Sequence, residues 1–286
     1  MSHQAEKLFF DKQRSWEAAE KLLNDSFKTV GSQFESQEAH NTFFRYIFTP
    51  KSKSWAYVPC GKAGTNTVLA ILFEIEFGVS LKTTFVTPEN LSSEAMHQTI
   101  NAGVFRALHL RSDIDSFASY FENAIKIAMV RNPTTRAWSS FRYLCKSNDV
   151  GSPQFVKERI RLTASVRFDW ERDPYTKVGF AKFLDYVELS LTNGSSGYNL
   201  DGHWRPQWYD VRPDFFRPSI VGKMEDIEEF EERLRQAFGA QPKRCRASLN
   251  ANTERSSLPE WFMEPDIRQR LVVVYGRDYE EFGYDL

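Results

Sequence analysis

The chain has 286 residues, of which 41% are hydrophobic and 26% charged, and its formal net charge is -1. This composition is that of an ordinary globular protein, and the length suits one large α/β domain or two small ones. The near-zero charge argues against nucleic acid as a partner and against a broad grip on a polyanionic polymer. Three widely separated cysteines indicate neither a disulfide framework nor a zinc site. With no apolar run of about 20 residues and no signal-peptide pattern at the start, a cytoplasmic protein is expected.

The first fifty residues are expected to form a helical extension (residues 1–50), followed by one main domain (residues 51–286). Apolar residues recur along 4–34 at the spacing of an amphipathic helix. Residues 41–48 are expected to form an aromatic connector before the first strand of the domain. The apolar face of the helix must pack against the domain or a second chain, so it offers a surface for a homodimer.

Residues 54–72 predict a buried strand, a turn of small residues and a helix with an apolar face. The turn carries Lys62 between Gly61 and Gly64. The backbone N–H groups and the positive dipole end at the start of such a helix can bind an anion. The order differs from the common nucleotide triphosphatase loop, in which the lysine follows the second glycine. The stretch alone fits either a phosphate-binding turn or a plain strand-to-helix turn with an exposed lysine.

Strands and helices alternate along the rest of the chain. The predicted strands cover residues 82–86, 104–110, 124–130 and 219–224, and the predicted helices lie within 88–100, at 113–121, from 133 onward, and at 153–162, 176–191, 225–238 and 264–275. Such alternation is typical of parallel strands joined by crossover helices. We therefore predict a single α/β domain with a central parallel sheet flanked by helices. Ligands of such sheets bind at the carboxyl ends of the strands, where Lys62 and Arg131 are both placed.

A second stretch begins where the strand 124–130 ends. It runs Arg131-Asn-Pro-Thr-Thr-Arg136 and continues to Ser139, and Pro133 suits the first residue of a helix. The planar guanidinium of an arginine and a nearby hydroxyl can hold one phosphate between them. The same residues also fit an arginine that caps a turn and a serine on a helix face.

Together the two stretches resemble the sulfotransferases that use 3′-phosphoadenosine 5′-phosphosulfate, and in particular the Golgi carbohydrate branch of heparan sulfate 2-O-sulfotransferases and HNK-1-type enzymes. The stretches 203–208, 220–225 and 274–284 share this resemblance, which covers the chain from about residue 54 to its end. It implies a P-loop-like phosphosulfate-binding loop. It also implies transfer of a sulfuryl group, without a metal, to a hydroxyl of a carbohydrate or small-molecule acceptor, with adenosine 3′,5′-bisphosphate as the other product.

The resemblance also implies which residues bind the donor. The 5′-phosphosulfate loop falls on Lys62, Ala63, Gly64, Thr65, Asn66 and Thr67, and the 3′-phosphate pair falls on Arg131 and Ser139. Arg255 matches a loop that closes over the nucleotide in the family, although it fits an exposed basic loop without a binding role equally well. Two departures from the family pattern stand out: Cys60-Gly61 separates Pro59 from Lys62, and Asn132 replaces a common aspartate.

The acceptor hydroxyl must lose a proton, and histidine is the usual base near neutral pH. His109 is predicted at the end of the strand 104–110, on the same edge of the sheet as Lys62 and Arg131. The 2-O-sulfotransferases have a catalytic histidine in the corresponding segment. His203 is the alternative base, although its setting equally suits lining the acceptor site or fixing a loop.

Two other functions stay open from the sequence. One is an ATP- and Mg²⁺-dependent small-molecule kinase, which the order of the motifs disfavours. The other is a non-catalytic nucleotide-binding protein. The near-neutral charge favours a small metabolite or a lipid-linked sugar over a glycosaminoglycan as acceptor.

Overall fold

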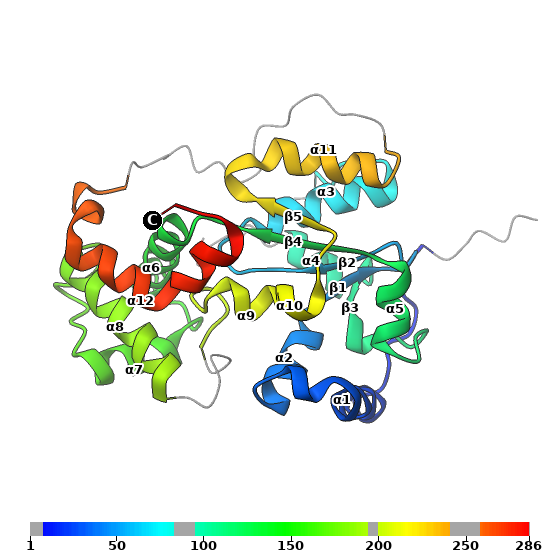
Figure 1. Cartoon of the computed structure of the whole chain (residues 1–286), viewed down its shortest axis with the longest axis horizontal. Helices are drawn as coiled ribbons and strands as arrows, with labels where there is room; N and C mark the ends of the chain where they lie inside the picture. The colour runs from blue at the N-terminus through cyan, green and yellow to red at the C-terminus, as the bar shows by residue number, and fades with distance from the viewer. Residues whose placement is uncertain (1–7, 83–94, 194–199, 241–257, 286) are drawn as a thin grey trace, which may run out of the picture.

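A five-stranded sheet forms the centre of the computed structural model, which describes residues 8–82, 95–193, 200–240 and 258–285 (Figure 1). The strand order is β3-β1-β2-β4-β5. The strands are β1 (Phe48–Pro50), β2 (Trp55–Val58), β3 (Phe105–Ala107), β4 (Ile125–Val130) and β5 (Ile220–Lys223). The predicted α/β fold is confirmed, with β2, β4 and β5 parallel. The sheet is mixed, however, because only a short turn separates β1 from β2, and a connection of that length reverses the chain.

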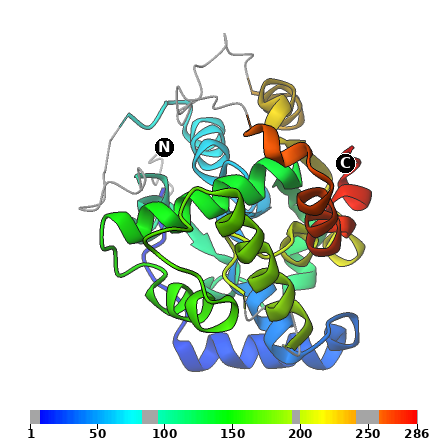
Figure 2. The ribbon, with the colours of Figure 1, turned by 90° about the vertical axis from the view of Figure 1, so that its left-hand side faces the viewer.

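Helices cover both faces of the sheet and its carboxyl end (Figure 1). On one face lie α3 (Thr65–Phe77) and α11 (Ile227–Ala237), and on the other α1 (Trp16–Val30), α2 (Gln37–Arg45) and α5 (Phe117–Asn123). Beyond the carboxyl ends of β2 and β4 lie α6 (Pro133–Asp149), α7 (Val156–Val166), α8 (Lys177–Asn193) and α12 (Pro265–Phe282), which face the viewer in Figure 2. The short helices are α4 (Ala95–Asn101), α9 (Gln207–Val211) and α10 (Pro213–Phe216), and the 3₁₀ turns are η1 (Gly31–Gln33), η2 (Leu108–Leu110), η4 (Met224–Asp226) and η5 (Glu260–Met263). In the described ranges no helix is long and apolar enough to cross a membrane.

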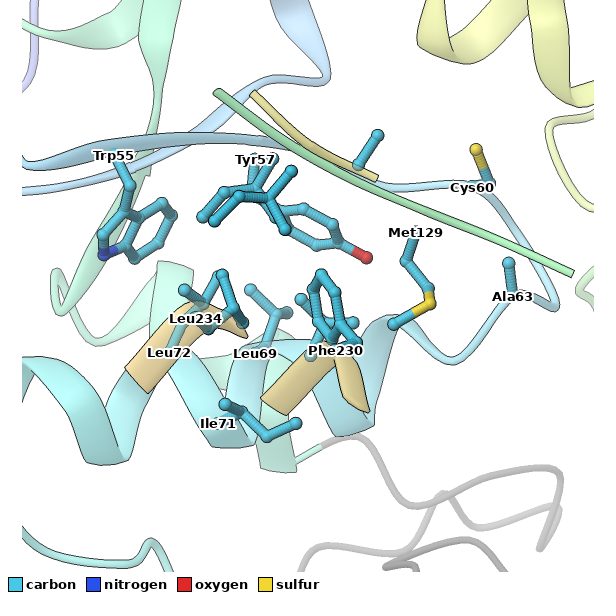
Figure 3. Close-up of a cluster of buried hydrophobic side chains, with 14 of the residues drawn as sticks. Trp55, Tyr57, Cys60, Ala63, Leu69, Ile71, Leu72, Met129, Phe230 and Leu234 are labelled. Carbon is cyan, nitrogen blue, oxygen red and sulfur yellow. The ribbon is translucent and has the colours of Figure 1, made fainter. Parts of the chain in front are cut away.

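The core between the sheet and the α3–α11 layer accounts for the strand, turn and helix predicted at 54–72. All four residues of β2 are buried, and Trp55 and Tyr57 pack towards Leu69, Leu72 and Phe230 (Figure 3). Burial on both faces of the strand explains why its sequence is a continuous apolar run instead of an alternating one. This core fixes the position at which the turn leaves the sheet.

Three predicted elements differ from those in the structure. Residues 41–45 continue helix α2 instead of forming a connector. The predicted strand 104–110 ends at Ala107, opposite the first residue of β1, and then turns into η2. Helix α5 starts later than predicted because Asp113 binds Arg111 (3.0 Å and 2.8 Å) and Ser116 provides the helix cap instead. The strand expected at 82–86 lies almost wholly outside the described residues.

The N-terminal segment is fastened to the edge strand β3. Residues 8–14 run beside it, with the N–H of Phe10 bonded to the carbonyl of Gly103 and the N–H of Arg14 to that of Leu110 (both 2.9 Å). The Arg106 side chain donates to the carbonyl of Lys12. Helices α1 and α2 then share a hydrophobic cluster with residues of β2 and α5. The first fifty residues therefore contribute to the core of the sheet.

Candidate active site

The turn between β2 and α3 holds Lys62 in a left-handed backbone conformation, with φ of 62°. Non-glycine residues rarely adopt this region, and they do so mainly where the surroundings enforce it. The N–H of Ala63 and the hydroxyl of Thr65 both donate to the carbonyl of Cys60 (3.2 Å each), which closes the turn. Gly64 caps α3 with φ of 84° and no side-chain hydrogen bond. The N–H groups at the start of α3 therefore point towards the turn, as helix geometry requires.

Lys62 lies among other cations beside an aromatic ring. Its Nζ is 3.9 Å from the ring centre of Tyr143 on α6. Burial and the charges of Arg131, Lys146 and Arg142 lower the pKa of Lys62 to about 8. Positive charges gathered in this way repel one another, so an anion that bound here would relieve that repulsion.

Arg131 contacts the same turn from the end of β4. Its Nη1 donates to the carbonyl of Lys62 (3.3 Å) and its Nε to the hydroxyl of Thr135 (3.1 Å). The side-chain amide of Gln207 pairs with both backbone groups of Arg131, accepting from its N–H and donating to its carbonyl (2.8 Å each). The structure thus brings together Lys62 and Arg131 from neighbouring parallel strands, at the sheet edge where the sequence places them.

Helix α6 carries Ser139 on the same face as Tyr143, one turn away. The helix begins at Pro133, as predicted, and the side chain of Asn132 accepts from the N–H of Thr135 (3.3 Å). Asn132 therefore caps the helix as an aspartate at this position would. Its own N–H donates to Glu225 (2.9 Å), so Glu225 fastens the turn that follows β4.

The Cys60-Gly61 pair, unexplained by the sequence, has a packing role. Cys60 is fully buried. A Cβ on Gly61 would lie 2.5 Å from the carbonyl oxygen of Gly202, so only glycine fits there. Arg136, which is 1% exposed, donates from Nε to the carbonyl of Gly61 (2.8 Å) and from Nη2 to that of Gly202 (3.1 Å). One buried guanidinium thus ties the lysine turn to the segment that contains His203.

His203 packs beside Tyr143, the ring that Lys62 also contacts. Its ring centre is 5.4 Å from that of Tyr143 and 5.1 Å from that of Phe155. Its Nδ1 is 2.6 Å from Oδ1 of Asp201, which also accepts from the backbone N–H of His203 (2.9 Å). Burial raises the pKa of Asp201, but the hydrogen bond and charge of His203 outweigh it, and the net pKa is lowered.

His109 is placed differently from its prediction as a strand-end residue beside Lys62. It belongs to the 3₁₀ turn η2, which packs against α1 and α2. The side chain is buried, and Nδ1 has no hydrogen-bond partner among the described residues. Burial and the charge of Arg45 lower the pKa of His109 to about 4. In the described part of the chain no hydrogen bond or ring contact joins it to Lys62 or Arg131, and Arg255 lies outside that part.

The residues of α12 that bind the backbone of residues 204–208 were not identified from the sequence. Asp278 on α12 is fully buried and accepts from the N–H groups of Gln207 (2.8 Å) and Trp208 (2.9 Å) at the start of α9. Burial raises the pKa of Asp278 to about 6. The Tyr275 hydroxyl donates to the carbonyl of Trp204 (2.9 Å). The stretches 203–208 and 274–284, which both share the family resemblance, could have indicated these contacts, because the structure brings the two stretches together.

This fold and site define an α/β protein with a lysine-bearing turn at the carboxyl edge of its parallel strands. Among the residues that the structure describes, no three His, Cys, Asp or Glu side chains are grouped as a metal site. A family model, described as the sulfotransferase family, matches residues 32–285, and the chain belongs to that family. It is therefore a transferase of sulfuryl groups. Searches of curated proteins and of solved structures found no match.

Proposed function

We propose that the protein transfers a sulfuryl group from 3′-phosphoadenosine 5′-phosphosulfate to a hydroxyl of a sugar or another small-molecule acceptor. The observation that carries the proposal is the contact between the Arg131 guanidinium and the backbone of Lys62. It joins two cations from adjacent parallel strands at the start of α3, where a doubly phosphorylated ligand would meet charge at two points. The carbohydrate branch of the family, a cytoplasmic location and a homodimer formed through the N-terminal helices are part of the proposal.

The donor would supply the sulfuryl group and a phosphate as leaving group. Its 5′-phosphosulfate would bind to the turn formed by Lys62, Ala63, Gly64, Thr65, Asn66 and Thr67, and its 3′-phosphate to Arg131 and Ser139, with Arg255 as a further contact. Lys62 and the N–H groups of α3 would stabilise the charge that builds on the leaving phosphate oxygen. The contacts to the 3′-phosphate lie away from the reacting atoms, so they would orient the donor.

The rings of Tyr143, Phe155 and His203 border the site beyond Lys62. Aromatic rings suit the apolar face of a sugar or another small ring, while nearby polar groups fix its orientation. This wall supports an acceptor that presents its hydroxyl from a ring.

Thermal unfolding in the presence of nucleotides tests the donor. A ligand at a hundredfold over its Kd adds about 2.7 kcal/mol to the free energy of unfolding. We expect this gain with adenosine 3′,5′-bisphosphate and not with AMP, ADP or ATP with Mg²⁺. A gain with ATP and Mg²⁺ alone would favour the kinase alternative. Binding of the bisphosphate with no turnover of the donor, even by water, would favour a non-catalytic protein.

A further inference from the structure

We propose that His203, oriented by Asp201, is the general base that takes the proton from the acceptor hydroxyl. The proposal rests on the proposed sulfuryl transfer and gives His203 the role that family resemblance assigns to His109. Three observations carry it: the contact that Lys62 and His203 share with the Tyr143 ring, the hydrogen bond to Asp201, and the packing of the imidazole ring.

The upper limit on the separation of Lys62 and His203 is compatible with an in-line reaction. Lys62 Nζ lies 3.9 Å from the Tyr143 ring centre, which lies 5.4 Å from the ring centre of His203. The His203 ring is thus no farther from Nζ than these two distances combined. In-line transfer places the leaving oxygen, the sulfur and the incoming oxygen in a row between the lysine and the base. With ordinary hydrogen bonds at each end, that row spans roughly 9 Å.

Asp201 sets the protonation of the imidazole. Its Oδ1 faces Nδ1 of His203 at 2.6 Å, and its lowered pKa keeps the carboxylate ionised. An ionised carboxylate accepts the Nδ1 proton, so the lone pair of the neutral ring is on Nε2. This is the arrangement by which a carboxylate orients a histidine base in other enzymes.

The surroundings of His203 hold the ring in place and leave it reachable. Phe155 has φ of 66°, a conformation that costs energy in a phenylalanine, and its ring packs edge-on against His203 at 79°. Ser140 and Arg136 bind the carbonyls of His203 and Gly202. The His203 side chain is still 31% exposed, whereas His109 is 6% exposed and packs beneath α1 and α2.

The reaction step balances with these groups. The acceptor oxygen forms a bond to sulfur while its proton passes to Nε2 of His203. The bond between sulfur and the 5′-phosphate oxygen breaks, and its electron pair stays on adenosine 3′,5′-bisphosphate, where Lys62 binds the oxygen. The sulfated acceptor leaves, and His203 returns its proton to water.

A measurement that needs no turnover is the NMR spectrum of the histidine rings. The chain has five histidines, so the ring signals of His203 and His109 can be assigned by comparison with His203→Asn and His109→Asn. We expect 3′-phosphoadenosine 5′-phosphosulfate to shift the His203 signals more than the bisphosphate does, because only the former carries the sulfuryl group. His109 should be unaffected. A shift of His109 with no shift of His203 would overturn the proposal.

Turnover of the donor gives the second test, with release of adenosine 3′,5′-bisphosphate measured in water as the acceptor. His203→Asn should reduce the rate by about 10²–10⁴-fold, the usual contribution of a general base, and keep its affinity for the bisphosphate. The matched variant His109→Asn should keep the wild-type rate. Wild-type turnover by His203→Asn would refute the base while leaving the proposed function standing. Absence of bisphosphate binding to the wild-type protein would refute the proposed function itself.

Asp201→Asn separates positioning from a merely structural role. An amide cannot hold the same tautomer through an ionic hydrogen bond, so turnover should fall and its pH profile should change, with bisphosphate binding retained. An unchanged pH profile together with a wild-type rate would show that Asp201 does not act through His203.

Discussion

Replacement of Lys62 by methionine should strengthen the fold while it abolishes the reaction. Burial and neighbouring cations lower the pKa of Lys62 from 10.5 to about 8. Each pKa unit corresponds to 1.36 kcal/mol, so the charge on Lys62 costs the folded state up to about 3 kcal/mol. Methionine keeps the aliphatic stem against Tyr143 and loses a cation–π contact worth about 0.5–2 kcal/mol. We expect the free energy of unfolding at neutral pH to rise by about 1–2 kcal/mol.

The pH dependence has a definite sign. The unfolded chain releases the Lys62 proton near pH 10.5 and the folded protein releases it near pH 8. Between these values the unfolded state binds more protons, so this residue makes the wild-type protein more stable as pH rises from 8 to 10.5. Lys62→Met should lack that rise, and the two proteins should converge in stability at high pH.

Urea unfolding at pH 7.5 and pH 10, with bisphosphate titration and donor turnover, checks the variant. We expect turnover to fall by at least 10²–10³-fold, the cost of removing one group that stabilises developing charge. Lys146→Met is a matched control, because it removes an exposed cation that also lowers the pKa of Lys62. A Lys62→Met protein that is clearly less stable than wild type would refute the electrostatic reasoning, and wild-type turnover would refute the role of Lys62.

Three further substitutions probe the site. Gly61→Ala should weaken bisphosphate binding at least tenfold in a titration because its Cβ would meet the carbonyl of Gly202. Gly202→Ala, whose Cβ would meet only a side chain at 3.5 Å, should bind the bisphosphate normally. Equal affinities of the two variants for the bisphosphate would exclude the close approach of Gly61 to Gly202. Arg131→Met should lower the affinity for the bisphosphate about 10–100-fold, the range for a hydrogen bond to a charged group, and leave the much weaker affinity for AMP unchanged. An equal loss for AMP would contradict a 3′-phosphate role. Burial raises the pKa of Asp278 to about 6, so its contribution to stability is present below its unfolded pKa near 4 and is lost as pH rises through 6. Asp278→Asn should remove up to about 3 kcal/mol of this loss of stability with rising pH, as measured by urea unfolding. A pH profile of stability identical to that of the wild type would show that Asp278 does not titrate in this range.

Local signals in the sequence predicted the two turns that carry Lys62 and Arg131. The apolar run of β2, the glycines of the turn and Pro133 at the start of α6 each act within a few residues, so a strand followed by a helix could be predicted at both places. The order of Lys62 and Arg131 along a parallel sheet then placed them at one edge. The proximity of Lys62 and Arg131 follows from the parallel order of their strands, and that order could be predicted from the alternation of strands and helices along the chain.

The placement of His109 and His203 depends on contacts between distant segments, which a single sequence does not specify. His109 follows an apolar pattern that continues to Leu110, but the strand ends at Ala107, opposite the first residue of its partner β1. This end could not be predicted from residues 104–110 alone. His203 lies beside Tyr143, and Arg136 and Ser140 bind the backbone at Gly202 and His203. Neither contact leaves a periodic pattern, so the sequence left the choice between two histidines open.

The N-terminal segment (residues 8–14) that runs beside β3 limits how far the chain can be shortened. The family match starts at residue 32, yet residues 8–14 supply hydrogen bonds to the backbone on either side of β3. Without them the carbonyls of Gly103 and Leu110 would lose these partners, and the outer edge of the sheet would be less covered. Exposed edges of this kind pair with strands of other molecules. A protein trimmed to the family boundary would also lose α1, whose Leu22 and Leu23 belong to the core shared with β2 and α5, so it would be less stable and would tend to aggregate through its sheet.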